Sequence, residues 1–248
     1  MKRTIKVFFV FGFILSITIG SFAQEEKEDP MKWNGDLALG ISVARGNADT
    51  TTLSFSFSAN KLLSEKFDWK NKGLFLVGKA GDVLNSQSLD LTSSAKWSHS
   101  RRFFSRYEIQ GIHDRFRNYR FRLIPNVAVG YKFVQAEATE LSLLTGLSDT
   151  FTKFYDSGDT ASYLGVFAGN DFIWKISSGA EFTQLSTLNL DLSDTSHIIA
   201  RFELNLAAAI ASGWALKISL IEKYDSAPET EGVKKNDLTF LTNISWKF

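Results

Sequence analysis

Charged side chains occupy every second position along several stretches of this sequence, and apolar side chains fill the positions between them. This alternation is typical of a strand with one polar and one apolar face. The charged residues best placed to line an enclosed interior are Lys96, Arg102, Arg106, Glu108, Arg122, Lys132, Arg201 and Glu203. The same polar face carries Asp36, Asp90, Glu140, Asp171, Lys217, Asp237 and Lys247.

Two kinds of chemistry suit such a set of charges. If they face water inside a tube, they select charged solutes. If they face one another, they pair and fill the tube, because buried charges need partners or water. Positive residues gather between positions 96 and 132 while negative ones are dispersed, so an open tube would weakly prefer anions. The sequence leaves both possibilities open.

Catalysis needs a constellation that the sequence does not offer. The three histidines are His99, His113 and His197. A lipid-cleaving hydrolase requires a serine and a histidine that meet, with a third group to orient the base. Ser196 and His197 are adjacent, so on a strand their side chains point to opposite faces. No glycine-rich phosphate loop follows a strand. We therefore predict no catalytic residue, and a lipid-acting enzyme is only an alternative.

Metal and cofactor sites are equally unsupported. The chain has no cysteine, which excludes disulfides, lipid-anchored cysteine and thiolate metal sites. Asp156 and Asp159 flank Ser157-Gly158 and could touch a hard cation, but this composition is typical of a solvated turn. A basic segment contains Arg115, Arg117, Arg120 and Arg122. It could pair with lipid phosphates, although a solvated loop is the simpler interpretation. We predict no metal and no cofactor.

The first residues are typical of an export signal. Lys2, Arg3 and Lys6 precede an uncharged apolar run from 7 to 20, and small residues follow up to Ala23. We predict a signal peptide over 1–23, a mobile lead-in over 24–32 and one domain over 33–248. The run is short for a membrane-spanning helix, and no later run is long enough. After cleavage acidic residues slightly exceed basic ones, which argues against nucleic acid as a partner.

From residue 33 onward a period of two continues to the end of the chain, which predicts strands. The expected strands cover 33–44, 50–61, 67–80, 88–98, 102–114, 121–134, 139–151, 161–176, 181–192, 197–211, 214–224 and 237–248. The ninth has mixed parity, which suggests a β-bulge. About ten residues suffice for a tilted strand to cross a membrane. We predict an all-β fold, a transmembrane antiparallel up-and-down β-barrel of about 12 strands. A soluble exported β-barrel that binds a small ligand is the alternative.

Connections and aromatic residues support the membrane barrel. Short predicted turns alternate with longer connections at 80–87, 115–120, 152–160 and 225–236, as in barrels with both termini in the periplasm. The connections at 45–49 and 193–196 are exceptions, because they belong to the outer set but are short. Every tryptophan would lie at the short-turn ends of strands, as in an aromatic girdle; these are Trp33, Trp69, Trp97, Trp174, Trp214 and Trp246. The outer rim would use Phe116, Tyr119, Phe121, Phe151, Tyr163 and Tyr224. The final strand should pair with the first to close the ring.

Short motifs in a consistent order carry a family resemblance. They are Trp33-Asn34-Gly35, Gly40-Ile41-Ser42, Gly46-Asn47, Asp114 with Arg122, Gly130-Tyr131 and the terminal segment 237–248. The chain resembles the domain-of-unknown-function family 481 over nearly its whole mature length. Members of that family are often labelled salt-induced outer-membrane proteins. The resemblance implies an outer-membrane barrel of unsettled activity, and it implies that the barrel-assembly machinery recognises the aromatic end at Trp246 and Phe248.

These observations lead to one expectation about function. We expect an integral protein of the outer membrane of a Gram-negative bacterium, acting either as a narrow solute channel or as a structural envelope protein. Its expected partners are outer-membrane lipid, lipopolysaccharide and, during insertion, the assembly machinery. No enzymatic activity is expected.

Overall fold

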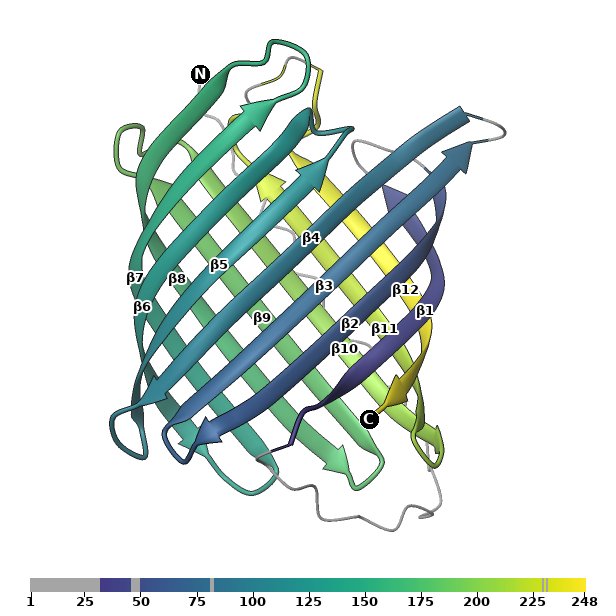
Figure 1. Ribbon diagram of the computed structural model, residues 1–248, viewed down its shortest axis with the longest axis vertical. Coiled ribbons are helices and arrows are strands. Elements are labelled where there is room, and N and C mark those ends of the chain that lie inside the picture. The colour runs from purple at the N-terminus through teal and green to yellow at the C-terminus, as the bar shows by residue number, and fades with distance from the viewer. Residues whose placement is uncertain (1–31, 46–49, 81–82, 229, 231) are drawn as a thin grey trace, which may run out of the picture.

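The computed structural model describes residues 32–45, 50–80, 83–228, 230 and 232–248, which form a closed barrel of antiparallel strands (Figure 1). The strands are β1 (Asn34–Arg45), β2 (Thr50–Ser64), β3 (Phe67–Ala80), β4 (Val83–Ser98), β5 (Phe103–Asp114), β6 (Tyr119–Gln135), β7 (Thr139–Phe154), β8 (Thr160–Ser177), β9 (Ala180–Asp191), β10 (Ile198–Ala211), β11 (Trp214–Asp225) and β12 (Asn236–Lys247). The predicted fold class is confirmed. The predicted signal peptide, and the lead-in except for Lys32, lie outside the described residues.

The last strand closes the ring on the first, as the sequence predicts. β1 and β12 pair antiparallel from Asp36 opposite Lys247 to Arg45 opposite Leu238. At the end of this seam the backbone N–H groups of Gly35 and Phe248 each donate to the other residue's carbonyl oxygen, at 3.0 and 3.1 Å. Closure leaves no unpaired strand edge, which is what a sheet needs in order to sit in lipid.

The two ends of the barrel differ in their connections. At the end where β1 begins and β12 finishes, here named the short-turn end, the connections are 65–66, 99–102, 136–138, 178–179 and 212–213. At the opposite end, the long-loop end, the described connections are 115–118, 155–159, 192–197 and, apart from 229 and 231, 226–235. Figure 1 shows the C-terminus at the short-turn end. Most of the described connections at the long-loop end are longer than those at the short-turn end, as predicted, although 115–118 is no longer than 99–102.

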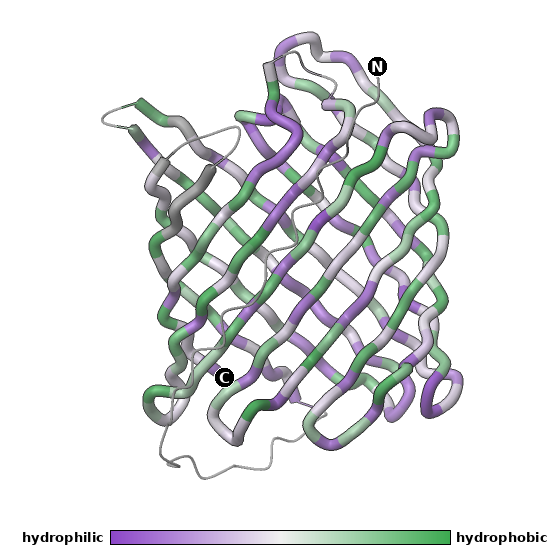
Figure 2. Tube along the Cα trace, turned by 180° about the vertical axis from the view of Figure 1, so that it is seen from behind, coloured by the Kyte–Doolittle hydropathy of each residue, from purple (hydrophilic) through white to green (hydrophobic). Residues whose placement is uncertain are grey.

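Apolar side chains cover the outside of the barrel. Leu39, Leu53, Leu147, Leu164 and Ile210 are all more than half exposed, and apolar and polar segments alternate along many of the strands (Figure 2). The inward positions of the same strands are mostly polar. A soluble barrel would reverse this arrangement, because water would then meet the outer face. The outer surface is suited to lipid instead.

The tryptophans form a rim at the short-turn end. Each of the six is 36–48% exposed and lies at or near the terminus of a strand at this end. The rings of Trp33 and Trp69 are 5.5 Å apart, and those of Trp246 and Phe248 are 5.8 Å apart. Indole rings favour the lipid headgroup level, so this rim marks one membrane boundary.

Three local expectations are wrong. β4 begins at Val83, so most of the predicted loop over 80–87 belongs to a strand. β9 pairs with β10 without interruption, and its register with β8 shifts only between Lys175 and Ser177, next to the turn; the predicted bulge is not within β9. Tyr119 and Tyr163 lie inside the barrel rather than on the outer rim: Tyr119 is only 3% exposed, and the Tyr163 ring lies 5.2 Å from the ring of the buried His197. No helix in the described part of the chain is long and apolar enough to cross a membrane.

Candidate lumen site

Ion pairs line the lumen near the short-turn end. Four of these pairs are Lys96 with Asp68 at 3.1 Å, Arg106 with Asp171 at 2.9 Å, Lys132 with Glu140 at 3.0 Å and Lys217 with Asp36 at 3.4 Å. Their carboxylate side chains remain 21–33% exposed although they point into the barrel. Exposed interior carboxylates are hydrated, so this part of the lumen is accessible to water.

Closer to the long-loop end, ion pairs cross the lumen. Asp90 of β4 binds Arg201 of β10, which lies six strands away in either direction around the ring. Lys223 of β11 also reaches Asp90, at 3.3 Å, and the amide nitrogen of Gln110 donates to it at 2.8 Å. We name Asp90, Arg201 and Lys223 the transverse bridge. It joins opposite walls, so it constricts the lumen at this level.

Arg201 also connects the transverse bridge to its own strand. Its guanidinium binds Glu203 at 3.0 Å, and the amide nitrogen of Asn205 donates to the same carboxylate at 3.0 Å. One cation therefore lies between two acids, and each acid has a further donor. Such charge-assisted bonds are the stronger class of hydrogen bond. This connection fixes the direction in which Arg201 reaches across the lumen.

Apolar side chains fill the remaining interior space on two sides. Leu74 and Leu76 of β3 pack with Ile221 of β11 and Leu241 of β12. A second cluster joins Phe104, Ala128, Leu144 and Phe167 from four successive strands, β5 to β8. The Phe104 ring lies over Gly130, where an added Cβ would be 2.3 Å from Cζ of the ring. These clusters narrow the lumen from the sides, so the polar groups concentrate in what is left.

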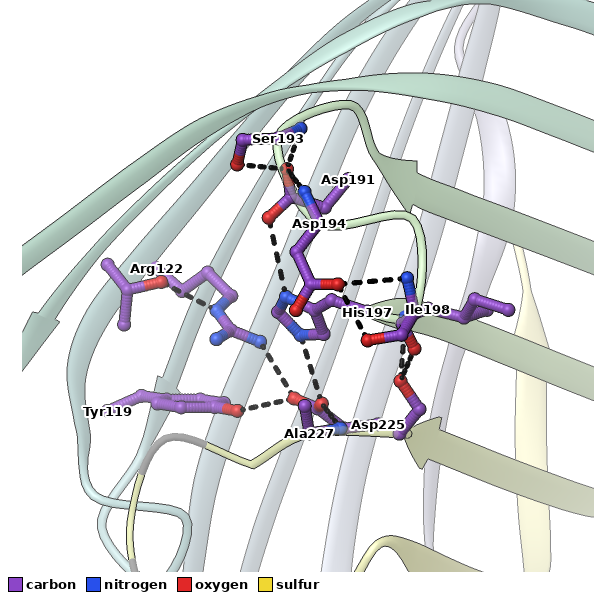
Figure 3. Close-up of polar contacts among 12 residues, drawn as sticks. Tyr119, Arg122, Asp191, Ser193, Asp194, His197, Ile198, Asp225 and Ala227 are labelled. Carbon is purple, nitrogen blue, oxygen red and sulfur yellow. Dashed lines mark hydrogen bonds and ion pairs between the residues drawn. The ribbon is translucent and has the colours of Figure 1, made fainter.

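The lumen at the long-loop end is occupied by the mouth network of Tyr119, Arg122, Asp191, His197 and Asp225 (Figure 3). Asp225 accepts from Nε2 of His197 at 3.1 Å and from the Tyr119 hydroxyl at 3.3 Å, and Nη1 of Arg122 lies 3.8 Å away. Nδ1 of His197 lies 3.6 Å from Asp191. Because β6 and β11 are five strands apart, this network also spans the barrel.

Stacking and turn contacts hold the mouth network in place. The Arg122 guanidinium lies 3.8 Å from the centre of the Tyr119 ring, and its Nε donates to the Thr152 hydroxyl at 2.8 Å. The loop before His197 is fixed by Asp194. Hydrogen bonds from the hydroxyl and the backbone N–H of Ser196 hold the pKa of Asp194 below its usual value. The Asp194 carboxylate is therefore charged at neutral pH and holds the turn at Ser196 through these hydrogen bonds.

One asparagine connects three of the loops above this network. Asn118 adopts a left-handed conformation, with φ of 64°, which asparagine tolerates better than most residues. Its side-chain oxygen accepts from the backbone N–H groups of Tyr155 and Asp156, at 3.1 and 3.0 Å. Its side-chain nitrogen donates to the Thr230 hydroxyl at 3.1 Å. The connections after β5, β7 and β11 are thereby held together over the mouth.

Exposure of the charged groups falls from one end of the lumen to the other. Side chains of Lys96 and Asp68 are 31% and 32% exposed, whereas those of Arg122 and Asp225 are 3% and 2% exposed. The lumen is thus accessible to solvent towards the short-turn end, whereas packed side chains fill it towards the long-loop end. Arg117, in the loop after β5, adds to the closure through an ion pair with Asp237 at 3.4 Å.

The structure places most of the predicted interior residues on the inward face. The side chains of Lys96, Arg106, Glu108, Arg122, Lys132, Arg201 and Glu203 all take part in the lumen contacts. Arg102 does not. It is exposed in the turn between β4 and β5, and its guanidinium donates to the hydroxyl of Tyr131 at 3.3 Å on the outer side. A turn residue has no strand parity, so alternation could not place it.

Sequence reasoning missed four interior groups: Asp225, Tyr119, Tyr163 and His197. Between Tyr119 and Phe121 the register of β6 shifts, so Arg120 and Phe121 are both exposed and Tyr119 points inward. No sequence signal marks that irregularity. Lys70 and Lys72 were also missed, although a signal existed. Trp69 and Phe75 of the same strand, β3, point outward. Both lysines have the opposite parity, which indicated that they point inward.

The structure offers no support for a catalytic or metal site. The Ser196 hydroxyl donates to Asp194 at 2.6 Å, whereas His197 is buried against Asp225, so the adjacent pair does not meet. Asp156 and Asp159 lie in an exposed loop. Among the described residues, no group of three or more His, Cys, Asp or Glu side chains is arranged to hold a metal ion.

Comparison with solved structures identifies the same architecture in known barrels. The NanC porin aligns over 86% of this chain and over its own full length, with 10% identity and a TM-score of 0.56. The KdgM porin aligns over 86% of this chain and over 99% of its own length, with 7% identity and a TM-score of 0.50. At such identities the likeness shows a shared fold. No curated protein matches the sequence.

A family match covers the whole barrel except the start of β1. The sequence profile described as "Protein of unknown function, DUF481" matches residues 37–248. The matched region includes the ion pairs at the short-turn end apart from Asp36, the transverse bridge and the mouth network. The resemblance that the short motifs indicated is confirmed, and the chain belongs to the DUF481 family.

Proposed function

We propose that this protein is an outer-membrane channel for small hydrated solutes, and that the mouth network closes it at the long-loop end in this conformation. The carrying observation is the gradient of exposure along the lumen. Its short-turn half is lined by hydrated ion pairs such as Lys96 with Asp68. Its other half is closed by side chains and loops, and these can rearrange without unfolding a strand.

The proposal includes a membrane setting. The outward apolar face and the tryptophan rim support insertion in a bilayer. We place the short-turn end in the periplasm and the long-loop end at the surface of a Gram-negative cell, after cleavage of a signal peptide over 1–23. Outer-membrane lipid would cover the apolar face, lipopolysaccharide would meet the exposed loops, and the barrel-assembly machinery would insert the chain.

A structural envelope barrel is the second candidate. The observation that favours it is the crossing of the lumen at two levels, by the transverse bridge and by the mouth network. Ion pairs that join opposite walls stiffen a barrel and exclude solutes. A lipid-acting enzyme has no comparable support, because Ser196 and His197 have separate partners. We therefore propose a protein without catalytic activity.

Single-channel recording in planar bilayers tests the channel proposal. Asp225 accepts from His197 and Tyr119 and faces Arg122, so the Asp225→Ala variant loses the acceptor that joins the two walls. We expect wild-type protein to give small, infrequent current steps. Asp225→Ala should open several times more often, because the remaining groups no longer bridge the mouth.

The matched control is Asp156→Ala, which removes one carboxylate from an exposed loop. It should behave as the wild type does. If neither the wild type nor Asp225→Ala gives current steps under any salt or voltage, while both proteins are folded, the channel proposal is wrong and the structural barrel remains.

A further inference from the structure

Two lysines in the open half of the lumen have no acid of their own. Lys70 and Lys72 occupy successive inward positions of β3, between the short-turn end and the buried Leu74. Lys70 is exposed inside the barrel and Lys72 is partly exposed. Among the residues that the structure describes, their ammonium groups form no ion pair and no hydrogen bond. Two cations on one wall repel each other, so an anion bound between them would relieve that repulsion.

The carboxylates around these lysines are already engaged. Lys70 interacts electrostatically with Asp68 and Asp171, and Lys72 interacts with Glu203. Asp68 binds Lys96 at 3.1 Å, Asp171 binds Arg106 at 2.9 Å and Glu203 binds Arg201 at 3.0 Å.

Each acid thus has a closer cation than Lys70 or Lys72. Within the described part of the chain neither ammonium group has a direct partner, although Arg106 and Arg201 are each shared by two acids, which lowers the local excess of positive charge.

We propose that Lys70 and Lys72 form a binding site for a small, doubly charged oxyanion, of the phosphate or dicarboxylate class, in the open half of the lumen. The site defines the class of solute that the proposed channel would carry. Only this role in transport rests on the channel proposal. Binding itself requires only that the anion enter from the short-turn end.

Geometry and hydration favour this class of ligand. Residues two apart on one face of a strand are separated by roughly 6.6 Å, twice the rise per residue, and lysine side chains are long and flexible. Their ammonium groups can converge on the oxygens of one anion. The neighbouring carboxylates repel a dianion more strongly than a monovalent anion, so a dianion stays only if it binds both lysines at once. A single chloride offers one contact point.

Isothermal titration calorimetry of the full barrel in a zwitterionic detergent tests the site. The probe is inorganic phosphate, added at constant ionic strength and near neutral pH, with chloride titrated in parallel. We expect phosphate to bind wild type at least about tenfold more tightly than it binds the double variant Lys70→Gln/Lys72→Gln, since two charge-assisted contacts are lost.

The matched control is Lys61→Gln/Lys66→Gln, which removes the same charge from the outer face and a turn. Lys61 lies 5.9 Å from the Trp33 ring outside the barrel, and Lys66 is exposed between β2 and β3. It should bind phosphate as the wild type does. Equal weakening in both double variants would overturn the site and indicate a general effect of net charge. Wild type that binds phosphate no better than chloride would also overturn it.

Bilayer recording separates this inference from the channel proposal. In a salt gradient, the reversal potential of wild-type channels should indicate preference for anions, and Lys70→Glu/Lys72→Glu should shift it towards cations. If the barrel binds phosphate through these lysines but never conducts, the channel proposal fails and the binding site stands. The site is wrong if the barrel conducts but Lys70→Gln/Lys72→Gln leaves the phosphate affinity unchanged and Lys70→Glu/Lys72→Glu leaves the reversal potential unchanged.

Discussion

At the scale of single residues, the function of a side chain in this barrel depends on what faces it across the lumen. Parity along a strand indicated that Arg106, Arg122 and Arg201 point inward. It could not indicate their partners, because Asp90 and Arg201 meet only when a ring of the correct register closes around them. Irregular residues such as Arg120 and turn residues such as Arg102 also escape a rule based on alternation.

Arg201 provides the first prediction at this scale. Arg201→Ala should lower the free energy of unfolding by about 1–3 kcal/mol, because it removes charge-assisted hydrogen bonds from two partly buried acids. Glu203 loses its ion pair, and Asp90 keeps Lys223 and the hydrogen bond from Gln110. Urea unfolding in lipid vesicles, followed by the mobility of unheated protein on gels, measures the change. Arg102→Ala removes an exposed arginine and should unfold at the wild-type urea concentration; an equal loss in both would contradict the role of the transverse bridge.

At the scale of elements, the strands were largely predictable and the loops were not. Alternation and the tryptophan positions indicated the number of strands, their order and their faces, because a sheet in lipid needs an apolar outer surface. Loop conformation depends instead on single contacts between distant segments. Asn118 and Thr230 are 112 residues apart and hydrogen-bond directly, and no local pattern anticipates that bond.

The loops give the second prediction. Asn118→Ala should expose the connection after β11, because Asn118 ties it to the connections after β5 and β7. Trypsin should then cut after Lys234 or Lys235 several times faster than in wild type, as fragment analysis will show. Asn118→Gly tolerates the same left-handed backbone but lacks the side chain. It should be cut as quickly as Asn118→Ala; wild-type resistance in the glycine variant would show that backbone conformation alone holds the loops.

The terminal strand gives the third prediction. Deleting Phe248 removes the two backbone hydrogen bonds to Gly35 and should destabilise the seam by about 1–2 kcal/mol. Phe248→Ala keeps those bonds and loses only the ring. Folding of purified chains into lipid vesicles should therefore suffer from the deletion but little from Phe248→Ala.

Assembly in cells distinguishes the seam from recognition of the aromatic end. If the assembly machinery reads the ring of Phe248, both variants should reach the membrane poorly, as measured by the amount of heat-modifiable barrel. Normal assembly of Phe248→Ala would show that Phe248 acts through the seam alone.

At the scale of the whole molecule, the decisive property is the difference between the two halves of the lumen. The same ring of strands encloses hydrated pairs near the short-turn end and packed, nearly inaccessible groups near the long-loop end. Composition could not reveal this difference, since charged residues occur along the whole polar face. It arises because the longer connections carry Arg117, Asn118 and His197 into the mouth, where they meet residues of distant strands.

The absence of cysteine from the chain makes this difference directly measurable. Ser94 and Ser148 both point into the lumen, but Ser94 is partly exposed near Lys70 and Ser148 is 3% exposed. In Ser94→Cys the thiol should react with a small water-soluble maleimide at least about tenfold faster than in Ser148→Cys, because reaction requires access to the thiolate. Equal rates would contradict a lumen closed on one side. Adding Asp225→Ala to Ser148→Cys should raise the slow rate towards the fast one, since loss of the mouth network admits the reagent from the long-loop end. If the rate stays low, packing other than the mouth network closes this half of the barrel.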